Sequence, residues 1–188
     1  MEEEKKANKE DGYQDRLLKT RSILISGEIN KDQADSFTKQ MLILDSESSD
    51  PIYVYINSPG GDVYSGFAIH DMIRHVSSPV YVVGEGLVAS AAALIYLAAA
   101  KERRLAFPHS TYLIHQPLSQ MKGVASDMAI QAEKMEELRK ALDQLIADAT
   151  GKDVKEVSAD TERDCWLSAS EALSYGIVSR IITRKSEI

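Results

Sequence analysis

A single serine brings a hydroxyl to the start of a mostly small and aliphatic stretch of the chain. The stretch reads LVASAAALIYLAAA over residues 87–100, and Ser90 is its fourth residue. The run before it, VYVVGEG, is rich in β-branched residues and ends at glycines, so Ser90 lies where a strand gives way to a helix. The free N–H of Ala91 at this helix start is placed to stabilise an oxyanion. The segment suits a nucleophile, although helix capping by Ser90 is the simpler interpretation.

Two consecutive glycines follow another β-branched run. The segment INSPGGD, residues 56–62, places Gly60 and Gly61 directly after the expected strand. Glycine lets the backbone approach a ligand closely and adopt dihedrals that other residues avoid, so this pair offers a second N–H for an oxyanion. Pro-Gly-Gly is also an ordinary turn, and that alternative stays open.

A histidine and an aspartate can complete a nucleophilic system. His115 ends the expected strand TYLIH, at the rim where α/β folds carry their active sites. Asp164, in TERDCWLSASEA, could orient the imidazole and stabilise its cation, as in a Ser-His-Asp arrangement. A structural histidine and a surface or capping aspartate are the alternatives. His70, His75 and His109 are expected to be exposed or to make simple hydrogen bonds.

Strand patterns alternate with helical patterns along the chain. The segments 22–26, 52–56, 80–84 and 111–115 read as buried strands. Between them, apolar residues recur at helical spacing, and Asn30 is a plausible cap for the first helix. This alternation predicts an α/β domain with parallel strands and right-handed crossovers.

Two later helices are also predicted. From Val124 to Asp148 apolar residues keep a step of three or four, and Gly151 lies just past the end. This helix is long for a small domain, so we expect part of it to project and pack on another subunit. The segment SASEALSYG carries a capping box in Ser168 and Glu171 and ends at Gly176.

Composition limits the partners, the number of domains and the cellular location that the chain can have. The 188 residues carry a formal net charge of −7, which argues against a nucleic-acid partner, and their number predicts one domain. The single cysteine, Cys165, cannot form an intramolecular disulfide, so a cytoplasmic location fits. Residues 1–12 are highly charged and predict a flexible tail. The apolar stretch at 86–100 is too short to span a bilayer, so no membrane association is expected.

Four motifs together resemble one known family. INSPGGDVYSGFAIHDMI, GLVASAAA, IHQPL and DTERDCWLSASEALSYGIV are similar, in order and separation, to segments of the ClpP peptidase family, over about residues 17–182. The resemblance implies a crotonase-like ββα spiral within the α/β class, with a protruding long handle helix at about 118–150 in a single peptidase domain, 13–188. It also implies a chamber of two stacked heptameric rings, to which an ATP-dependent Clp-type unfoldase delivers unfolded protein substrates.

The resemblance assigns roles residue by residue. Ser90 matches the nucleophile, His115 the general base and Asp164 the residue that orients the base. Gly61 and Ala91 match the positions whose N–H groups form the oxyanion hole, with Gly60 close by. Arg163 resembles the arginine that links one ring to the other. This chemistry implies no metal and no cofactor.

Three departures from the family pattern point to a divergent second paralogue. Leu87 and Val88 precede Ser90 and three alanines follow it, where the family usually has Met-Ala-Ala-Ser-Met-Gly-Ala. The segment LSQMKGVAS, usually glycine-rich, keeps only Gly123, and the N-terminal segment is replaced by charged residues. We therefore expect either a homo-oligomer or a hetero-oligomer with a paralogous subunit, and poor activity of the chain alone.

Other function classes remain as alternatives. A weakly active or catalytically silent subunit of a mixed ring would need the same fold without turnover. An acyl-CoA hydratase or isomerase shares the fold and an oxyanion hole but has no need of Ser90, His115 and Asp164 together. A thiol peptidase that uses Cys165 is a further possibility.

Overall fold

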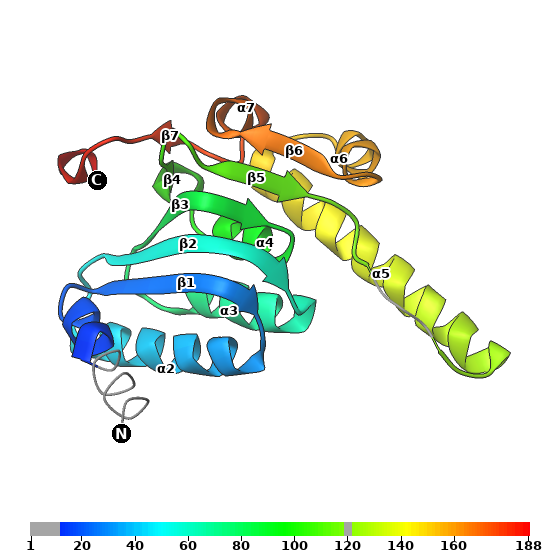
Figure 1. Ribbon diagram of the computed structural model, residues 1–188, viewed down its shortest axis with the longest axis horizontal. Helices are drawn as coiled ribbons and strands as arrows, with labels where there is room; N and C mark the ends of the chain where they lie inside the picture. Colours follow the sequence, from blue (N-terminus) through cyan, green and yellow to red (C-terminus); the bar gives the residue numbers. More distant parts are fainter. Residues whose placement is uncertain (1–11, 119–121) are drawn as a thin grey trace, which may run out of the picture.

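The strands form one seven-stranded sheet, as this computed structural model describes it for residues 12–118 and 122–188. The main order is β1-β2-β3-β4-β7, while β5 pairs with β3 and β6 pairs with β5 (Figure 1). All pairs are parallel except β5–β6, which is antiparallel. The bounds are β1 Ser22–Ile29, β2 Ile52–Gly61, β3 Val80–Ala89, β4 Arg104–Ala106, β5 Thr111–Ile114, β6 Cys165–Ser168 and β7 Arg180–Ile181. The predicted parallel α/β architecture is confirmed, and β4, β6 and β7 are additions to it.

Helices cover one side of this sheet. A short helical stretch at residues 12–18 precedes β1. Helices α2, α3 and α4 lie together on one side of the sheet, whereas α6 and α7 lie near β6 (Figure 1). The helices are α2 Lys31–Glu47, α3 Val63–His75, α4 Ala91–Leu97, α5 Ala125–Thr150, α6 Val154–Thr161 and α7 Ala169–Tyr175, with 3-10 turns at Lys101–Arg103 and Lys185–Glu187.

The predicted helix ends are confirmed by their hydrogen bonds. The Asn30 side chain accepts the N–H of Gln33 at 3.0 Å, and Ser168 with Glu171 forms the expected capping box. Gly151 and Gly176 end α5 and α7 in the left-handed conformation. These local signals therefore set where the helices start and stop.

The long strands bend, and each bend lets one strand serve two parts of the sheet. The first half of β3 pairs with β4 through Val82–Gly84, and its second half pairs with β5 through Leu87–Ala89. Between these halves, the Leu87 N–H donates to the Asn57 side chain at 3.1 Å, where the β2–β3 register also shifts. Two strand segments and one helix thus form each turn of a spiral, in agreement with the predicted ββα arrangement.

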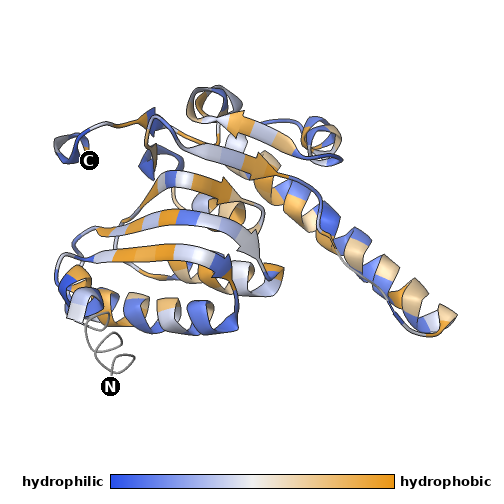
Figure 2. Cartoon of the chain, viewed as in Figure 1, coloured by the Kyte–Doolittle hydropathy of each residue, from blue (hydrophilic) through white to orange (hydrophobic). Residues whose placement is uncertain are grey.

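The core lies between the sheet and its covering helices, and α4 is the helix buried along its whole length. All seven residues of α4 are buried, and the central strands are largely apolar (Figure 2). Tyr96 packs edge-on against Tyr112 with ring centroids 5.3 Å apart, and its hydroxyl donates to the Leu105 carbonyl at 2.8 Å. Burial raises the pKa of both tyrosines, so both remain neutral hydrogen-bonding groups. The apolar stretch around Ser90 is therefore a core helix, as predicted, and none of the described helices is long and apolar enough to span a bilayer.

Helix α5 extends away from the body of the molecule, as its length predicted (Figure 1). Its buried residues all lie in its last third, from Leu142 to Thr150. Nearer its start, Met128 and Ile130 are 41% and 59% exposed. The helix begins at Ala125, later than the expected start of the handle at about 118, and residues 119–121 lie outside the described residues. The same holds for residues 1–11 of the predicted flexible tail.

Arg21 joins three segments at the edge of this fold. It lies just before β1 with φ of 54°, a left-handed conformation that is uncommon for a residue other than glycine. Its guanidinium donates to the carbonyl oxygens of Leu44, Ser48, Asp50 and Pro51 and to the hydroxyl of Ser78. Arg21 therefore satisfies the last carbonyls of α2 and holds the loop that leads into β2.

Arg21→Ala should lower the free energy of unfolding by about 1–3 kcal/mol, because several carbonyl groups lose their donor. Arg21→Lys should recover little of this, since an ammonium group cannot reach five acceptors in the planar fork geometry. Thermal unfolding followed by circular dichroism measures the loss, and Arg16→Ala, at an exposed arginine, is the matched control. Equal melting temperatures for the Arg21 and Arg16 variants would contradict this role.

Candidate active site

Ser90 occupies a strained turn between β3 and α4. Its φ is 56° and its ψ −123°, and its side chain makes no capping hydrogen bond, so the simpler interpretation as a helix cap is wrong for the hydroxyl. The backbone conformation is held by its own N–H, which donates to the Leu113 carbonyl at 2.9 Å, and by its carbonyl, which accepts from Ala93 and Leu94. Such strain persists only where surrounding contacts fix it and is concentrated at functional sites.

The two glycines place the end of β2 directly against this turn. A Cβ atom on Gly60 would lie 2.7 Å from the Cβ of Ser90 and 3.0 Å from the nitrogen of Ala91, so only glycine fits. Gly61 leaves no room for a Cβ either, which would clash with the backbone of Ile29. Both were expected in a turn after the strand, but β2 continues through Gly61, because Glu28 and Ile29 of β1 still pair with them.

The candidate oxyanion groups differ in their access to the site. Ala91 is the first residue of α4, so its N–H has no acceptor within the helix. Gly61 and Ala91 both line the cavity that contains Ser90, whereas Gly60 is buried behind the turn. Gly61 and Ala91 are therefore the better placed pair.

His115 and Asp164 lie at neighbouring ends of two paired strands. The antiparallel register of β5 and β6 runs from Thr111–Ser168 to Ile114–Cys165, so the next positions opposite each other are His115 and Asp164. Directly opposed residues in antiparallel strands have Cβ atoms about 5 Å apart. His115 is half-buried and Asp164 is exposed. Among the described residues, no hydrogen bond connects the side chains of Ser90, His115 and Asp164 to one another.

Ser90 and His115 open on one cavity of about 540 Å³. The apolar part of its wall comes largely from α4 and from α5 residues between Met135 and Ile146, while Asp164 does not line the cavity. The residues that the two helices contribute are Ala91, Ala93, Leu94 and Leu97 from α4, and Met135, Leu138, Leu142 and Ile146 from α5. The cavity can therefore hold an apolar group next to the hydroxyl of Ser90.

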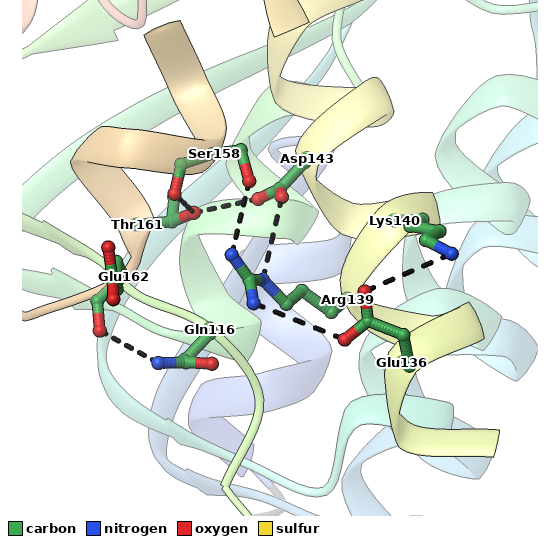
Figure 3. Close-up of polar contacts among 8 residues, drawn as sticks. All are labelled: Gln116, Glu136, Arg139, Lys140, Asp143, Ser158, Thr161 and Glu162. Carbon is green, nitrogen blue, oxygen red and sulfur yellow. Dashed lines mark hydrogen bonds and ion pairs between the residues drawn. The ribbon is translucent and has the colours of Figure 1, made fainter. Parts of the chain in front are cut away.

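A polar network holds the segments that carry His115 and Asp164. The backbone N–H of Gln116 donates to the Thr161 carbonyl at 2.7 Å. The side-chain amide of Gln116 donates to the Glu162 carbonyl, also at 2.7 Å (Figure 3). These bonds fasten the residue after His115 to the segment just before Asp164. They therefore limit how far the two strand ends can move apart.

The same segment is fastened to α5 by a buried carboxylate. Asp143 is 4% exposed, and its Oδ1 accepts the hydroxyl of Thr161 at 2.7 Å. Its Oδ2 lies 3.9 Å from Nε of Arg139. Another nitrogen of the same guanidinium, Nη2, donates to the hydroxyl of Ser158 at 3.2 Å (Figure 3). The sequence analysis did not identify Asp143, although a carboxylate directly after Leu142 in the apolar stripe of α5 is a signal that could have indicated it.

The other histidines, Cys165 and Arg163 do not line this cavity. His75 and His109 are exposed, and Nδ1 of buried His70 lies 2.9 Å from Oδ1 of Asp71, as expected for histidines outside the site. Burial, followed by the charge of Asp160, raises the pKa of the Cys165 thiol, which disfavours the thiolate that a thiol peptidase would need. Arg163 is exposed, just before Asp164. Within the described part of the chain, no group of three or more His, Cys, Asp or Glu residues could hold a metal.

Comparisons with known proteins agree with this arrangement. The family model described as Clp protease matches residues 4–185. The chain is 50% identical over 188 residues to the ATP-dependent Clp protease proteolytic subunit 2 of Treponema denticola, a match that covers 100% of this chain and 94% of the relative. It is 46% identical over 172 residues to proteolytic subunit 3 of Rhizobium etli, covering 92% of this chain and 89% of the relative.

A solved structure extends the likeness to the fold. A point mutant of ClpP1 from Listeria monocytogenes superposes with a TM-score of 0.86 at 46% identity, covering 92% of this chain and 96% of that chain.

Asp143→Ala should destabilise the protein by about 1–3 kcal/mol, because it leaves the buried hydroxyl of Thr161 without its main acceptor and removes a partner of Arg139. Asp143→Asn keeps an acceptor oxygen and should lose less. Chemical denaturation measures both, and Asp148→Ala on the exposed face of α5 is the control. A loss no greater than that of the Asp148 variant would show that the network contributes nothing to stability.

Proposed function

The chain belongs to the Clp protease family, as a proteolytic subunit, and from this premise we propose that it is a serine endopeptidase whose nucleophile is Ser90. The observation that carries the proposal is the strained turn at Ser90, whose hydroxyl is not used for capping and opens on the same cavity as His115. A positive φ at a serine costs free energy. The role of a nucleophile accounts for this cost, because its hydroxyl must be available to a substrate and not bonded to its own helix.

In the proposed reaction, the oxygen of Ser90 attacks the carbonyl carbon of a peptide bond while His115 takes the hydroxyl proton. The N–H groups of Ala91 and Gly61, with Gly60 beside them, hold the oxyanion of the tetrahedral intermediate. The C–N bond then breaks, and His115 returns the proton to the leaving amine. Water then attacks the acyl-enzyme ester and gives a proton to His115. The ester C–O bond breaks, His115 returns that proton to the oxygen of Ser90, and the acid is released.

Asp164 is proposed to orient His115 and to stabilise its cation. Support comes from the register of β5 and β6, in which His115 and Asp164 are the positions that follow the last paired residues, Ile114 and Cys165. The Gln116 hydrogen bonds to Thr161 and Glu162 give further support, because they hold the two segments together. The apolar wall of the cavity supports binding of an apolar side chain next to the cleaved bond.

The other function classes have less support. The curated relatives described above are named as proteolytic subunits, so neither a coenzyme A hydratase nor a silent ring subunit is favoured. The raised pKa of Cys165 speaks against a thiol peptidase.

Assembly is the second part of the proposal. Proteolytic subunits of this family form ring oligomers and pair with Clp ATPases. We propose stacked heptameric rings, formed by this chain alone or with a paralogous subunit, that receive unfolded proteins in the cytoplasm. The exposed apolar residues of α5 and the exposed Arg163 support contacts between subunits. The altered residues around Ser90 and the loss of glycines before α5 favour a mixed ring.

Ser90→Ala should abolish peptide hydrolysis and leave the fold intact, because the side chain makes no hydrogen bond that the fold needs. The measurement is cleavage of fluorogenic peptides, together with covalent labelling by a fluorophosphonate. Ser110→Ala, at a buried serine outside the cavity, is the control for labelling. Labelling of the Ser90→Ala chain at the native rate would refute the nucleophile assignment.

Arg163→Ala should shift the native mass of the assembly toward single rings and reduce peptide hydrolysis. The charge lies one residue from Asp164, so a loosened contact between rings also disturbs the catalytic segment. Analytical ultracentrifugation, with and without a paralogous subunit, follows the mass. Arg184→Ala, another exposed arginine, controls for loss of charge alone. An unchanged large particle would count against this role of Arg163.

A further inference from the structure

Among the described residues, Asp62 is the only carboxylate that lines the cavity of Ser90. The other titratable side chains among the residues that line it are those of His115 and Tyr64. The rest of this described lining is apolar or small, and it includes no lysine or arginine. The charge of Asp62 therefore dominates the electrostatic environment of a peptide bound there.

The carboxylate of Asp62 is ionised and caps helix α3 through its oxygen Oδ1. Oδ1 accepts the N–H of Ser65 at 2.7 Å and its hydroxyl at 2.6 Å, which caps α3. These hydrogen bonds hold the pKa of Asp62 below its usual value, so the group is an anion at neutral pH. The backbone N–H of Tyr64 also lowers the pKa of Asp62, and within the described residues no cationic nitrogen lies within 4.0 Å of its carboxylate.

Asp62 is also close to the reacting atoms. The end of β2 contacts the Ser90 turn at Gly60, and Asp62 follows two residues later. Because successive Cα atoms are about 3.8 Å apart, the Cα of Asp62 lies within about 8 Å of the Cα of Gly60. An extended peptide advances about 3.3 Å per residue, so a substrate side chain one or two residues from the cleaved bond can reach Oδ2.

We propose that Asp62 selects peptides that carry lysine or arginine two residues from the cleaved bond, on one side of it, and that it disfavours aspartate and glutamate there. This inference rests on the proposed role of Ser90 and adds a substrate class to it. The apolar wall from α4 and α5 still receives the residue next to the bond. Since Asp62 is exposed to solvent, the preference should be modest, about fivefold, and should weaken with salt.

The experiment compares two fluorogenic peptides that differ only by lysine or glutamate at the position two residues before the bond, and a second pair that varies the position two residues after it. The readout is the ratio of kcat/KM for lysine over glutamate in the assembled protein. Asp62→Asn removes the charge and retains capping, because asparagine caps helices as well as aspartate does. Asp153→Asn is the matched control, since Asp153 also caps a helix but does not line the cavity.

The expected ratio is about five in one of the two pairs at low salt, and near one for Asp62→Asn. It should also fall toward one at about 0.5 M salt and stay unchanged for Asp153→Asn. An Asp62→Asn ratio equal to that of the native chain would overturn the inference.

A binding measurement separates this inference from the proposed function. The Ser90→Ala chain should bind the lysine peptide more tightly than the glutamate peptide in fluorescence anisotropy, and the Ser90→Ala/Asp62→Asn chain should bind both equally. Equal binding by the Ser90→Ala chain overturns the Asp62 inference, whether or not the native chain hydrolyses either peptide. If binding is charge-selective but the native chain hydrolyses neither peptide, the proposed role of Ser90 is contradicted and the Asp62 inference is not.

Discussion

The site depends on one close approach, between the end of β2 and the turn that carries Ser90. No side chain fits at position 60, because a Cβ there would overlap Ala89 and Ser90. This contact fixes the end of β2 against the start of α4, so that Gly61, Ser90 and Ala91 line the same cavity. Ser90 keeps a positive φ there, and its hydroxyl makes no capping hydrogen bond to α4. Electrostatic stabilisation of an oxyanion requires donors that are in place before the reaction, and backbone groups locked by close packing meet that requirement.

A second set of contacts connects α5 to the same site. The outer part of this helix is exposed, but its last third packs against the body and holds the segment before Asp164 through Asp143 and Thr161. A buried carboxylate is costly unless it is hydrogen-bonded and paired, and Asp143 has both kinds of partner. A force on the exposed part of α5 can therefore reach His115 and Asp164 through a short series of bonds.

Local patterns in the sequence predicted much of this arrangement. Asn30, Ser168 and Gly151 act within one helical turn of their positions, so their roles could be read directly from the sequence. The hydroxyl of Ser90 was harder to interpret, because a serine at a helix start normally caps and only the backbone dihedrals reveal that this one does not. The extension of β2 through two glycines, and the pairing of β6 with β5, depend on neighbours distant in sequence, which a local pattern does not contain. The apolar stripe of α5 could have indicated that Asp143 is buried, but its partner Thr161 comes from another helix and could not be predicted locally.

Topologically, all of α5 and α6 is the loop of one β-hairpin. Strand β5 ends at Ile114, its antiparallel partner β6 begins at Cys165, and every residue between them is a connection that leaves the sheet and returns to it. The entropic cost of closing a loop rises only with the logarithm of its length. Insertions or deletions within the projecting part of α5 should consequently leave the register of β5 and β6, which ends at Ile114 and Cys165, unchanged. The length of the projecting helix and the geometry of the strand ends next to His115 and Asp164 can therefore vary independently.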